Sequence, residues 1–181
     1  MRAVFLDRDG VLNECRVVDG KPYPPESIDS FRILPGAAEA CAKLKQAGFA
    51  LVVVTNQPDV GRGTQTMDAV EAMHDILRAN LPLDAVYVCT HGSDSECDCR
   101  KPKPGMLIRA ADDLGIDLAS SFMVGDRWRD VDCGYAAGCQ TVFIDYGYDE
   151  RLRREPNAIV VDIAQAAEYV LGHSLSTVLD H

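Results

Sequence analysis

The stretch Phe5-Leu6-Asp7-Arg8-Asp9-Gly10 gives the strongest indication of the fold. It begins inside a short apolar run, residues 3–6, that is long enough for one buried strand of a parallel sheet. Because side chains alternate along a strand, Asp7 and Asp9 are expected on the same side of the chain. Such a pair suits a reaction in which one carboxylate acts as the nucleophile and the other transfers a proton. An Asp-Gly turn after a strand is the alternative interpretation.

The composition is that of one globular domain, expected to span residues 1–181. No apolar run approaches the roughly 20 residues that a membrane span requires, and the early first run leaves no room for a signal peptide. We therefore expect a cytoplasmic protein without a membrane partner. The net charge of −10 argues against nucleic-acid binding. The sequence has no obvious exposed apolar stripe, so a monomer is expected.

Apolar runs alternate with segments of helical periodicity along the chain. The apolar runs are residues 3–6, 49–54, 85–88, 122–124, 141–144 and 158–161. Helices are expected at about 37–47, 66–80, 105–114, 131–137 and 163–171. This alternation predicts an α/β protein with a three-layer α/β/α Rossmann-like parallel sheet and no large cap domain. The polar, proline-bearing segment 11–33 is expected to be a loop or small flap over the end of the first strand.

Reactive side chains follow four of these apolar runs. They are Asp7 and Asp9 after the first, Thr55 and Asn56 after the second, Cys89 and His91 after the third, and Asp126 after the fourth. In open parallel sheets, ligands bind beyond the carboxyl ends of the strands. The sequence therefore predicts one site at this edge of the sheet.

Four motifs resemble those of the haloacid dehalogenase (HAD) superfamily of phosphatases, in order and spacing, over roughly the first 145 residues. They are Phe5-Leu6-Asp7-Arg8-Asp9-Gly10, Val54-Thr55-Asn56-Gln57, Arg100-Lys101-Pro102-Lys103-Pro104-Gly105 and Val124-Gly125-Asp126-Arg127. The resemblance implies a HAD-type fold and hydrolysis of a phosphomonoester through an aspartyl-phosphate.

The resemblance also implies catalytic and metal-binding roles. Asp7 attacks phosphorus, and Asp9 protonates the leaving oxygen and later activates water. Thr55 hydrogen-bonds a phosphoryl oxygen, while Lys101 neutralises the transferring group and holds Asp7. Mg²⁺ is expected to be bound by Asp7, by the backbone carbonyl of Asp9 and by Asp126.

Substrate contacts are expected from residues near the same motifs. Asn56 shapes the phosphate pocket, and Arg100 and Arg127 contact the substrate. Arg62 lies in an expected loop over residues 58–65, where it either meets a second phosphate or is a solvated loop arginine.

Three other residues have two interpretations each. Asp130 either caps the helix expected at 131–137 or supports the metal from outside its ligand shell. Trp128 either lines the cleft or packs. His74 is interpreted as a surface or packing residue in preference to a catalytic one.

A cluster of cysteines and one histidine predicts a second metal site. Its members are Cys89, His91, Cys97 and Cys99, with a five-residue spacer between the two pairs. Three thiolates and one imidazole are the ligand set of a closed, tetrahedral, structural Zn²⁺ site. Four unrelated polar positions are the alternative. Bound zinc would stiffen the loop at about residues 89–99 and so position the basic motif that follows it.

Within the superfamily, the zinc loop resembles that of two groups, the D-glycero-D-manno-heptose-1,7-bisphosphate 7-phosphatases and the histidinol-phosphate phosphatases. The short spacer is more similar to the histidinol-phosphate enzymes, whereas residues 56–63 and 101–106 are more similar to the heptose enzymes. A loop arginine suits a second anionic group, so the 7-phosphate of a sugar bisphosphate is the expected target. Histidinol phosphate is the alternative substrate. A zinc-stabilised binding protein without turnover is the alternative from another class.

Overall fold

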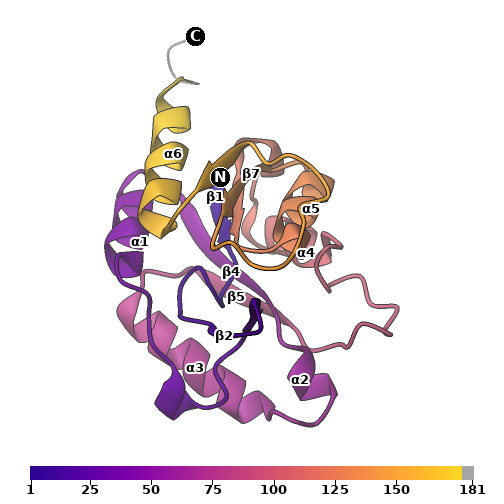
Figure 1. The fold of residues 1–181 in the computed structure, drawn as a ribbon. Helices are drawn as coiled ribbons and strands as arrows, with labels where there is room; N and C mark the ends of the chain where they lie inside the picture. The colour runs from indigo at the N-terminus through magenta and orange to yellow at the C-terminus, as the bar shows by residue number, and fades with distance from the viewer. Residues whose placement is uncertain (177–181) are drawn as a thin grey trace.

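A six-stranded, fully parallel sheet forms the centre of the computed structural model, which describes residues 1–176 (Figure 1). Its strands, in the spatial order β5-β4-β1-β6-β7-β8, are β5 (Ala85–Cys89), β4 (Ala50–Asn56), β1 (Ala3–Leu6), β6 (Phe122–Gly125), β7 (Gln140–Ile144) and β8 (Ala158–Val160). The predicted parallel α/β sheet is confirmed. Residues 177–181 of the expected domain lie outside the described part of the chain.

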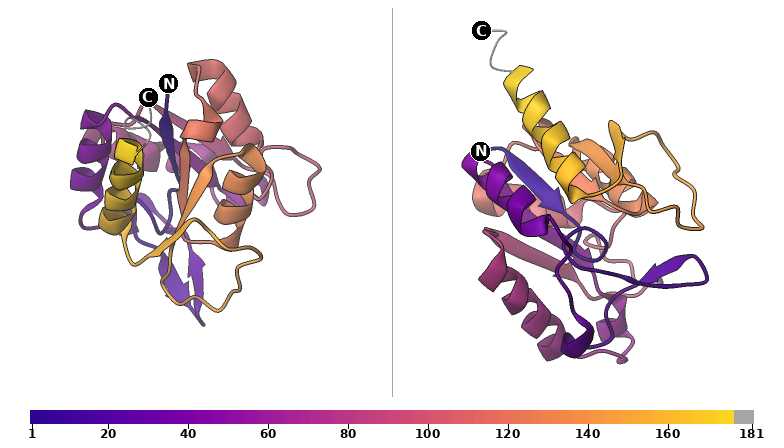
Figure 2. Two further views of the ribbon diagram at one scale, coloured as in Figure 1. Left: turned by 90° about the horizontal axis from the view of Figure 1, so that it is seen from above. Right: turned by 60° about the vertical axis from the view of Figure 1, so that its left-hand side comes forward.

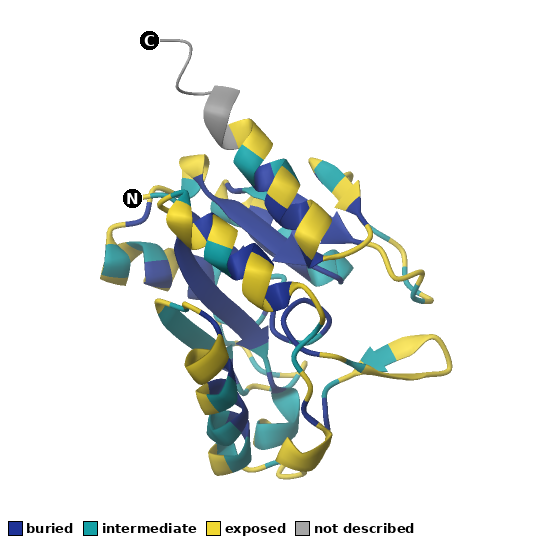
Figure 3. Ribbon diagram, turned by 90° about the vertical axis from the view of Figure 1, so that its left-hand side faces the viewer, coloured by how far each residue is buried: buried dark blue, intermediate teal, exposed yellow. Residues whose placement is uncertain are grey.

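Helices cover both faces of the sheet (Figure 2). One face carries α1 (Ala37–Gln46), α3 (Met67–Asn80) and α6 (Ile163–Ser176), and the other carries α4 (Gly105–Leu114) and α5 (Trp128–Ala137). Alternation along β1 explains the two cores, because Val4 and Leu6 pack with the first set and Ala3 and Phe5 with the second. Figure 3 shows the buried strands behind the half-buried helices α1 and α6.

Helix α3 is stabilised by a capped first turn and by one buried apolar face. Thr66 precedes it and accepts a hydrogen bond from the backbone of Ala69, which caps the first turn. Met73 and Leu77, four residues apart, are buried on one side. Truncating Leu77 to alanine is expected to cost about 2–5 kcal/mol, as for other fully buried leucines.

The segment expected to be a flap contains a small hairpin. Strands β2 (Arg16–Val18) and β3 (Lys21–Tyr23) pair antiparallel and are followed by the 3-10 turn Ile28–Ser30. The carbonyl oxygen of Gly20, in the hairpin turn, accepts a hydrogen bond from the backbone of Asp149, 2.9 Å away. Figure 3 shows this hairpin projecting beyond the carboxyl ends of the sheet. Such short, exposed strands bury no alternating face, so their pattern does not reveal them.

Three element boundaries differ from the prediction, and one of them is the end of α6, which runs to Ser176 and not to residue 171. A short helix, α2 (Pro58–Gly61), replaces part of the loop expected at residues 58–65. Helix α5 begins at Trp128 and not at residue 131, so Asp130 lies inside its first turn. The interpretation of Asp130 as the N-cap is therefore wrong. Its carboxylate instead accepts from the backbone N–H of Arg127, 3.0 Å away, which is the residue that precedes the helix.

The order of the strands determines where a ligand can bind. Strand β1 lies between β4 and β6, and the chain builds the sheet outward in opposite directions from it. The carboxyl ends of these three strands therefore border the crevice at the topological switch point. No helix in the described residues is both long and apolar enough to cross a membrane.

Candidate active site

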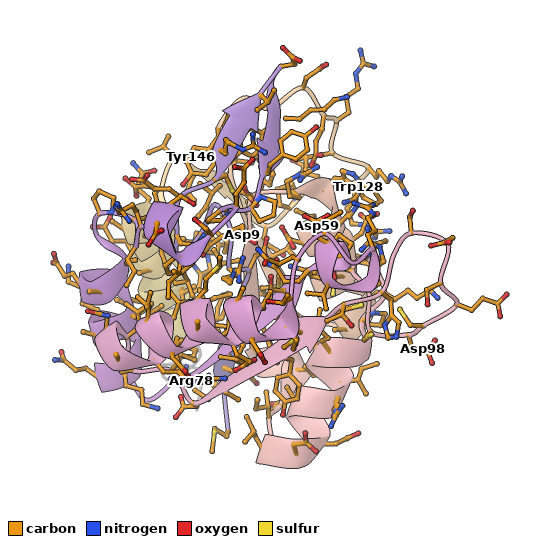
Figure 4. The ribbon with its side chains drawn as sticks, turned by 90° about the horizontal axis from the view of Figure 1, so that it is seen from below. Asp9, Asp59, Arg78, Asp98, Trp128 and Tyr146 are labelled. Carbon is orange, nitrogen blue, oxygen red and sulfur yellow. The ribbon has the colours of Figure 1, made fainter. Side chains whose placement is uncertain are left out.

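A cleft of about 370 Å³ lies at this switch point. Its charged lining residues are Asp7, Asp9, Asp59, Arg62, Arg100, Lys101, Asp126, Arg127, Arg129 and Asp130. Asn56 also lines it, and Pro22, Tyr23 and Pro24 of the flap border it. Figure 4 shows Asp9 and Asp59 close together near the middle of the molecule, well away from Asp98 on the projecting loop. The structure thus brings together nearly all of the residues predicted for catalysis and substrate binding.

Lys101 holds Asp7 from the side of α5. Its Nζ lies 2.8 Å from Oδ1 of Asp7 and 2.7 Å from Oδ1 of Asp130, and it donates to the carbonyl oxygen of Val54 at 2.9 Å. Burial and then Asp130 raise the pKa of Asp7 to about 7, although Lys101 opposes the shift. Burial disfavours the lysine cation, but the two carboxylates reverse that effect and raise its pKa. Asp7 is thus a carboxylate whose charge depends on its cationic neighbours.

Asp126 is the least satisfied group in the cleft. Both of its carboxylate oxygens are buried without a hydrogen-bond partner among residues 1–176. Burial first, and then the charges of Asp7 and Asp130, raise its pKa well above the usual range, although the nearby Tyr148 hydroxyl and Arg127 oppose the shift. Gly10 leaves room for it, because a Cβ there would meet the Asp126 carboxylate. A buried carboxylate of this kind requires a cation or a proton.

The oxygens around Asp126 fit Mg²⁺, which prefers hard oxygen ligands. Asp7, Asp126 and Asp130 each offer a carboxylate oxygen within 4.8 Å of the others. Asp130, however, already binds Lys101 and the Arg127 backbone through its two oxygens. Asp7 and Asp126 are therefore the carboxylates available to a cation, and Asp130 supports them through Lys101.

Asp9 is surrounded by donors. Arg8 donates to its Oδ1 through Nη2 at 2.9 Å, Asn13 donates to Oδ1 at 2.9 Å, and Gln57 donates to Oδ2 at 2.7 Å. The same Gln57 amide donates to Oγ1 of Thr55 at 2.9 Å. Asp9 is thus held on a fixed scaffold at the floor of the cleft.

Thr55 and Asn56 do not occupy equivalent positions. Thr55 is fully buried and is absent from the lining of the cleft. Asn56 lines the cleft and pairs with the backbone of Lys101 in both directions, each at 3.1 Å. It therefore fixes the position at which the Lys101 side chain leaves the loop.

Four arginines contribute positive charge to the rim. Arg127 is already engaged, because its Nε and Nη2 donate to the carboxylate of Glu150. Arg62 is exposed and pairs with Asp59 at 3.3 Å, and Arg100 donates to the backbone oxygen of His91. Burial and the nearby arginines lower the pKa of Arg129. The cleft thus has an anion-attracting rim in a chain of net charge −10.

The side chains of Cys89, His91, Cys97 and Cys99 come together closely enough to hold one metal ion. Their four ligand atoms lie within 4.8 Å of one another. The Sγ atoms of Cys89 and Cys97 are 3.8 Å apart, and His91 Nδ1 is 3.3 Å from Cys99 Sγ. Zn–S bonds of about 2.3 Å place tetrahedral sulfurs about 3.8 Å apart, so the spacing fits Zn²⁺. Burial raises the pKa of Cys89 to about 12, and a bound metal would displace this proton.

Sequence reasoning missed several residues of the site. Gln57 stood inside a motif without an assigned role, yet it joins Thr55 to Asp9. Arg129 carried no signal beyond its charge, and it reaches the cleft because α5 begins early. Trp128, predicted to line the cleft or to pack, is absent from the lining, and the guanidinium of Arg153 lies 3.4 Å from its ring centroid.

A parallel sheet with two aspartates after its first strand, a third carboxylate after a neighbouring strand and a buried lysine beside them defines a HAD-type phosphatase. The HAD-hydrolase-like family profile matches residues 98–166. The D-glycero-beta-D-manno-heptose-1,7-bisphosphate 7-phosphatases of Pseudomonas aeruginosa and Escherichia coli K12 are 36% and 40% identical to this chain. Each alignment covers 93% of this chain, and the alignments cover 97% and 87% of those proteins. This chain belongs to the family of the heptose-1,7-bisphosphate 7-phosphatases.

A solved structure agrees with this assignment. The D,D-heptose 1,7-bisphosphate phosphatase from B. bronchiseptica, complexed with magnesium and phosphate, superimposes with a TM-score of 0.80 at 34% identity. The match covers 96% of this chain and 99% of that one. The corresponding enzyme from Burkholderia thailandensis gives a TM-score of 0.65 at 28% identity.

Proposed function

We propose that this phosphatase removes the 7-phosphate of D-glycero-D-manno-heptose 1,7-bisphosphate. The observation that carries the proposal is the pair Asp7 and Asp126, one held by Lys101 and the other without a partner among the described residues, at the floor of an arginine-rimmed cleft. The names of the relatives from P. aeruginosa and E. coli support the choice of substrate and of its β anomer.

Each step of the reaction is assigned to residues of this chain. Lys101 and the Arg8 amide both bind Oδ1 of Asp7, which leaves Oδ2 to attack phosphorus. The new O–P bond forms as the bond to the sugar oxygen breaks, and Asp9 gives that oxygen a proton. Asp9 then takes a proton from a water that attacks the aspartyl-phosphate, which releases inorganic phosphate and restores Asp7.

Bound Mg²⁺, held by Asp7, Asp126 and the backbone carbonyl of Asp9, would neutralise the charge that gathers on the phosphoryl oxygens. Lys101 supplies a second, fixed positive charge to the same group. Thr55 is fully buried and shares the Gln57 amide with Asp9, so we assign it a role that supports Asp9 through Gln57. Asn56 keeps Lys101 in place from its backbone.

The rim favours a substrate with two anionic groups. Arg62, Arg100 and Arg129 line the cleft beyond the catalytic carboxylates. A second phosphate would meet these cations, whereas the amine of histidinol phosphate would be repelled by them. Arg127 is tied to Glu150, so we assign it a supporting position behind the substrate contacts. We further propose a structural Zn²⁺ in the cysteine cluster, a cytoplasmic location and a single domain.

The test compares kcat/KM for the heptose bisphosphate and for histidinol phosphate in the presence of Mg²⁺, since this ratio measures the difference in transition-state binding. We expect kcat/KM to be at least about a hundredfold higher for the bisphosphate, because its second phosphate forms additional charged contacts with the rim arginines. A preference for histidinol phosphate would reverse the choice of substrate. Failure to release phosphate from any phosphomonoester, p-nitrophenyl phosphate included, would favour the binding protein without turnover.

A further inference from the structure

The guanidinium of Arg8 is buried beneath the cleft, between Asp9 and helix α3. Its side chain is 1% exposed, and the Phe31 ring lies 5.9 Å from its Cζ. Nε and Nη2 donate to Oδ1 of Asp9 at 3.1 and 2.9 Å, and Nη2 also reaches Oδ2 at 3.2 Å. The remaining nitrogen, Nη1, lies 3.5 Å from Nε2 of His74. Each nitrogen of this buried cation therefore has a partner, as burial of a charge requires.

His74 connects Arg8 to the outer surface of α3. Its side chain is fully buried, and its Nδ1 lies 3.0 Å from Oε1 of Glu71. A guanidinium only donates and a carboxylate only accepts, so a neutral ring with its proton on Nδ1 satisfies both neighbours. Burial lowers the pKa of His74, in keeping with that neutral ring. Arg78 donates to the other oxygen of Glu71 at 3.1 Å and anchors the end of the network.

We infer that His74 is a positioning residue for Asp9 and that it acts through Arg8. The inference rests on the proposed role of Asp9 as general acid and base. Arg8 provides three of the contacts to Asp9, and His74 Nε2 is the acceptor that Nη1 meets on the opposite side of the guanidinium, 3.5 Å away. An apolar side chain at position 74 would leave Nη1 without this acceptor, so the guanidinium would turn and the carboxylate of Asp9 would move with it.

The expected defect is confined to proton transfer to the leaving oxygen. A sugar alkoxide needs a proton in order to leave, whereas p-nitrophenolate leaves without one. The ratio kcat/KM includes only steps up to the departure of the leaving group. A misplaced Asp9 therefore lowers kcat/KM for sugar phosphates and spares kcat/KM for p-nitrophenyl phosphate. A loss of folded protein or of Mg²⁺ binding lowers both values together.

The experiment compares His74→Leu with His74→Gln in the full chain with Mg²⁺. Leucine fills the space without an acceptor, and glutamine offers an amide oxygen to Nη1 of Arg8. The probes are p-nitrophenyl phosphate and the best substrate from a set of sugar phosphates that includes the heptose bisphosphate. Asp9→Asn is the reference for an enzyme that lacks the general acid. Leu77→Ala, on the same face of α3, is the control for destabilisation alone.

We expect kcat/KM of His74→Leu to fall by about tenfold or more for the sugar phosphate, because a small misplacement of a catalytic group slows the step in which it acts. For the aryl phosphate we expect a fall of less than about threefold. His74→Gln should recover most of this loss, and Leu77→Ala should lower Tm without changing the ratio between the two substrates. Equal losses on both substrates in His74→Leu, or no loss, would overturn the inference. Wild-type turnover tests the proposed function separately, because the inference depends only on the ratios between variants.

Discussion

The carboxylate of Asp126 is buried without a hydrogen-bond donor among the described residues, although an unpaired buried charge costs several kcal/mol. The cation that acts on it, Arg127, is already paired with Glu150, and Lys101 is shared by Asp7 and Asp130. Protein side chains therefore do not neutralise it. A divalent cation between Asp7 and Asp126 would do so, which makes the stability of the protein depend on both metal and pH.

The stabilisation by Mg²⁺ is expected to increase with pH. In the metal-free protein, the pKa of Asp7 is raised from 3.8 to about 7, and that of Asp126 is raised in the same direction. Both acids ionise more easily in the unfolded chain, so their contribution to stability is lost as pH rises from about 4 to about 7. Bound Mg²⁺ favours the ionised pair. The rise in Tm on adding Mg²⁺ should thus be larger at about pH 7.5 than at about pH 5.5.

The measurement is thermal unfolding with Mg²⁺ or with a chelator at the two pH values. Asp126→Asn is the matched control, because it removes one charge and keeps the shape of the side chain. Its Mg²⁺-dependent shift should be small at both pH values. An equal shift for the wild type at both pH values would argue against this account.

Replacing the attacking carboxylate should abolish turnover and leave the fold intact. Asp7→Asn retains a side chain of the same shape, yet its amide cannot form an aspartyl-phosphate. We expect phosphate release to fall by roughly 10³-fold or more, as for other removed nucleophiles. Circular dichroism and Tm check the fold. Near-normal release in this variant would exclude Asp7 as the nucleophile.

At the scale of elements, the zinc loop and the basic motif are continuous. Cys99 is followed directly by Arg100 and Lys101, and the Arg100 side chain donates to the backbone of His91, itself a member of the cluster. Lys103 donates to the backbone oxygen of Cys97 at 2.6 Å. A metal in the cluster would therefore position the rim of the cleft without touching the reacting atoms.

Loss of this metal should affect the substrate more than the fold of the sheet. We expect purified protein to contain about one equivalent of zinc, and Cys97→Ser to lose it. KM for the bisphosphate should then rise by about tenfold, because Arg100 is no longer held in place. Cys41→Ala, a buried cysteine of α1, is the control and should keep both zinc and KM. A zinc-free wild-type protein with normal KM would contradict the prediction.

At the scale of the whole molecule, the protein combines a strongly negative net charge with a cationic rim confined to one cleft. Like charge opposes the approach of two copies, and short-range cations still hold a small anion. We therefore expect a monomer. Light scattering should give a mass near 19.7 kDa, and a mass twice that value at micromolar concentration would show a dimer.

Much of the fold could be predicted because each central strand is an uninterrupted apolar run. Residues 3–6 and 122–124 were expected as strands, and β1 and β6 cover them. The hairpin of residues 16–23 could not be predicted, because its short, exposed strands have no alternating buried face and its hydrogen bond from Asp149 to Gly20 joins residues far apart in the sequence. The residues of the site were also predicted only in part. The carboxylates of the motifs were expected, whereas Gln57 had no assigned role.

The sequence by itself determined the strands, their polar ends and thus which residue types meet at the switch point, because apolar periodicity and local spacing encode these features. Tertiary structure alone decided which partner each side chain binds. It tied Arg127 to Glu150, left Asp126 without a donor in the described chain, and placed His74 against Arg8. Those outcomes depend on the packing of α3 and α5 against the sheet, and contacts between distant segments leave no mark on local sequence patterns.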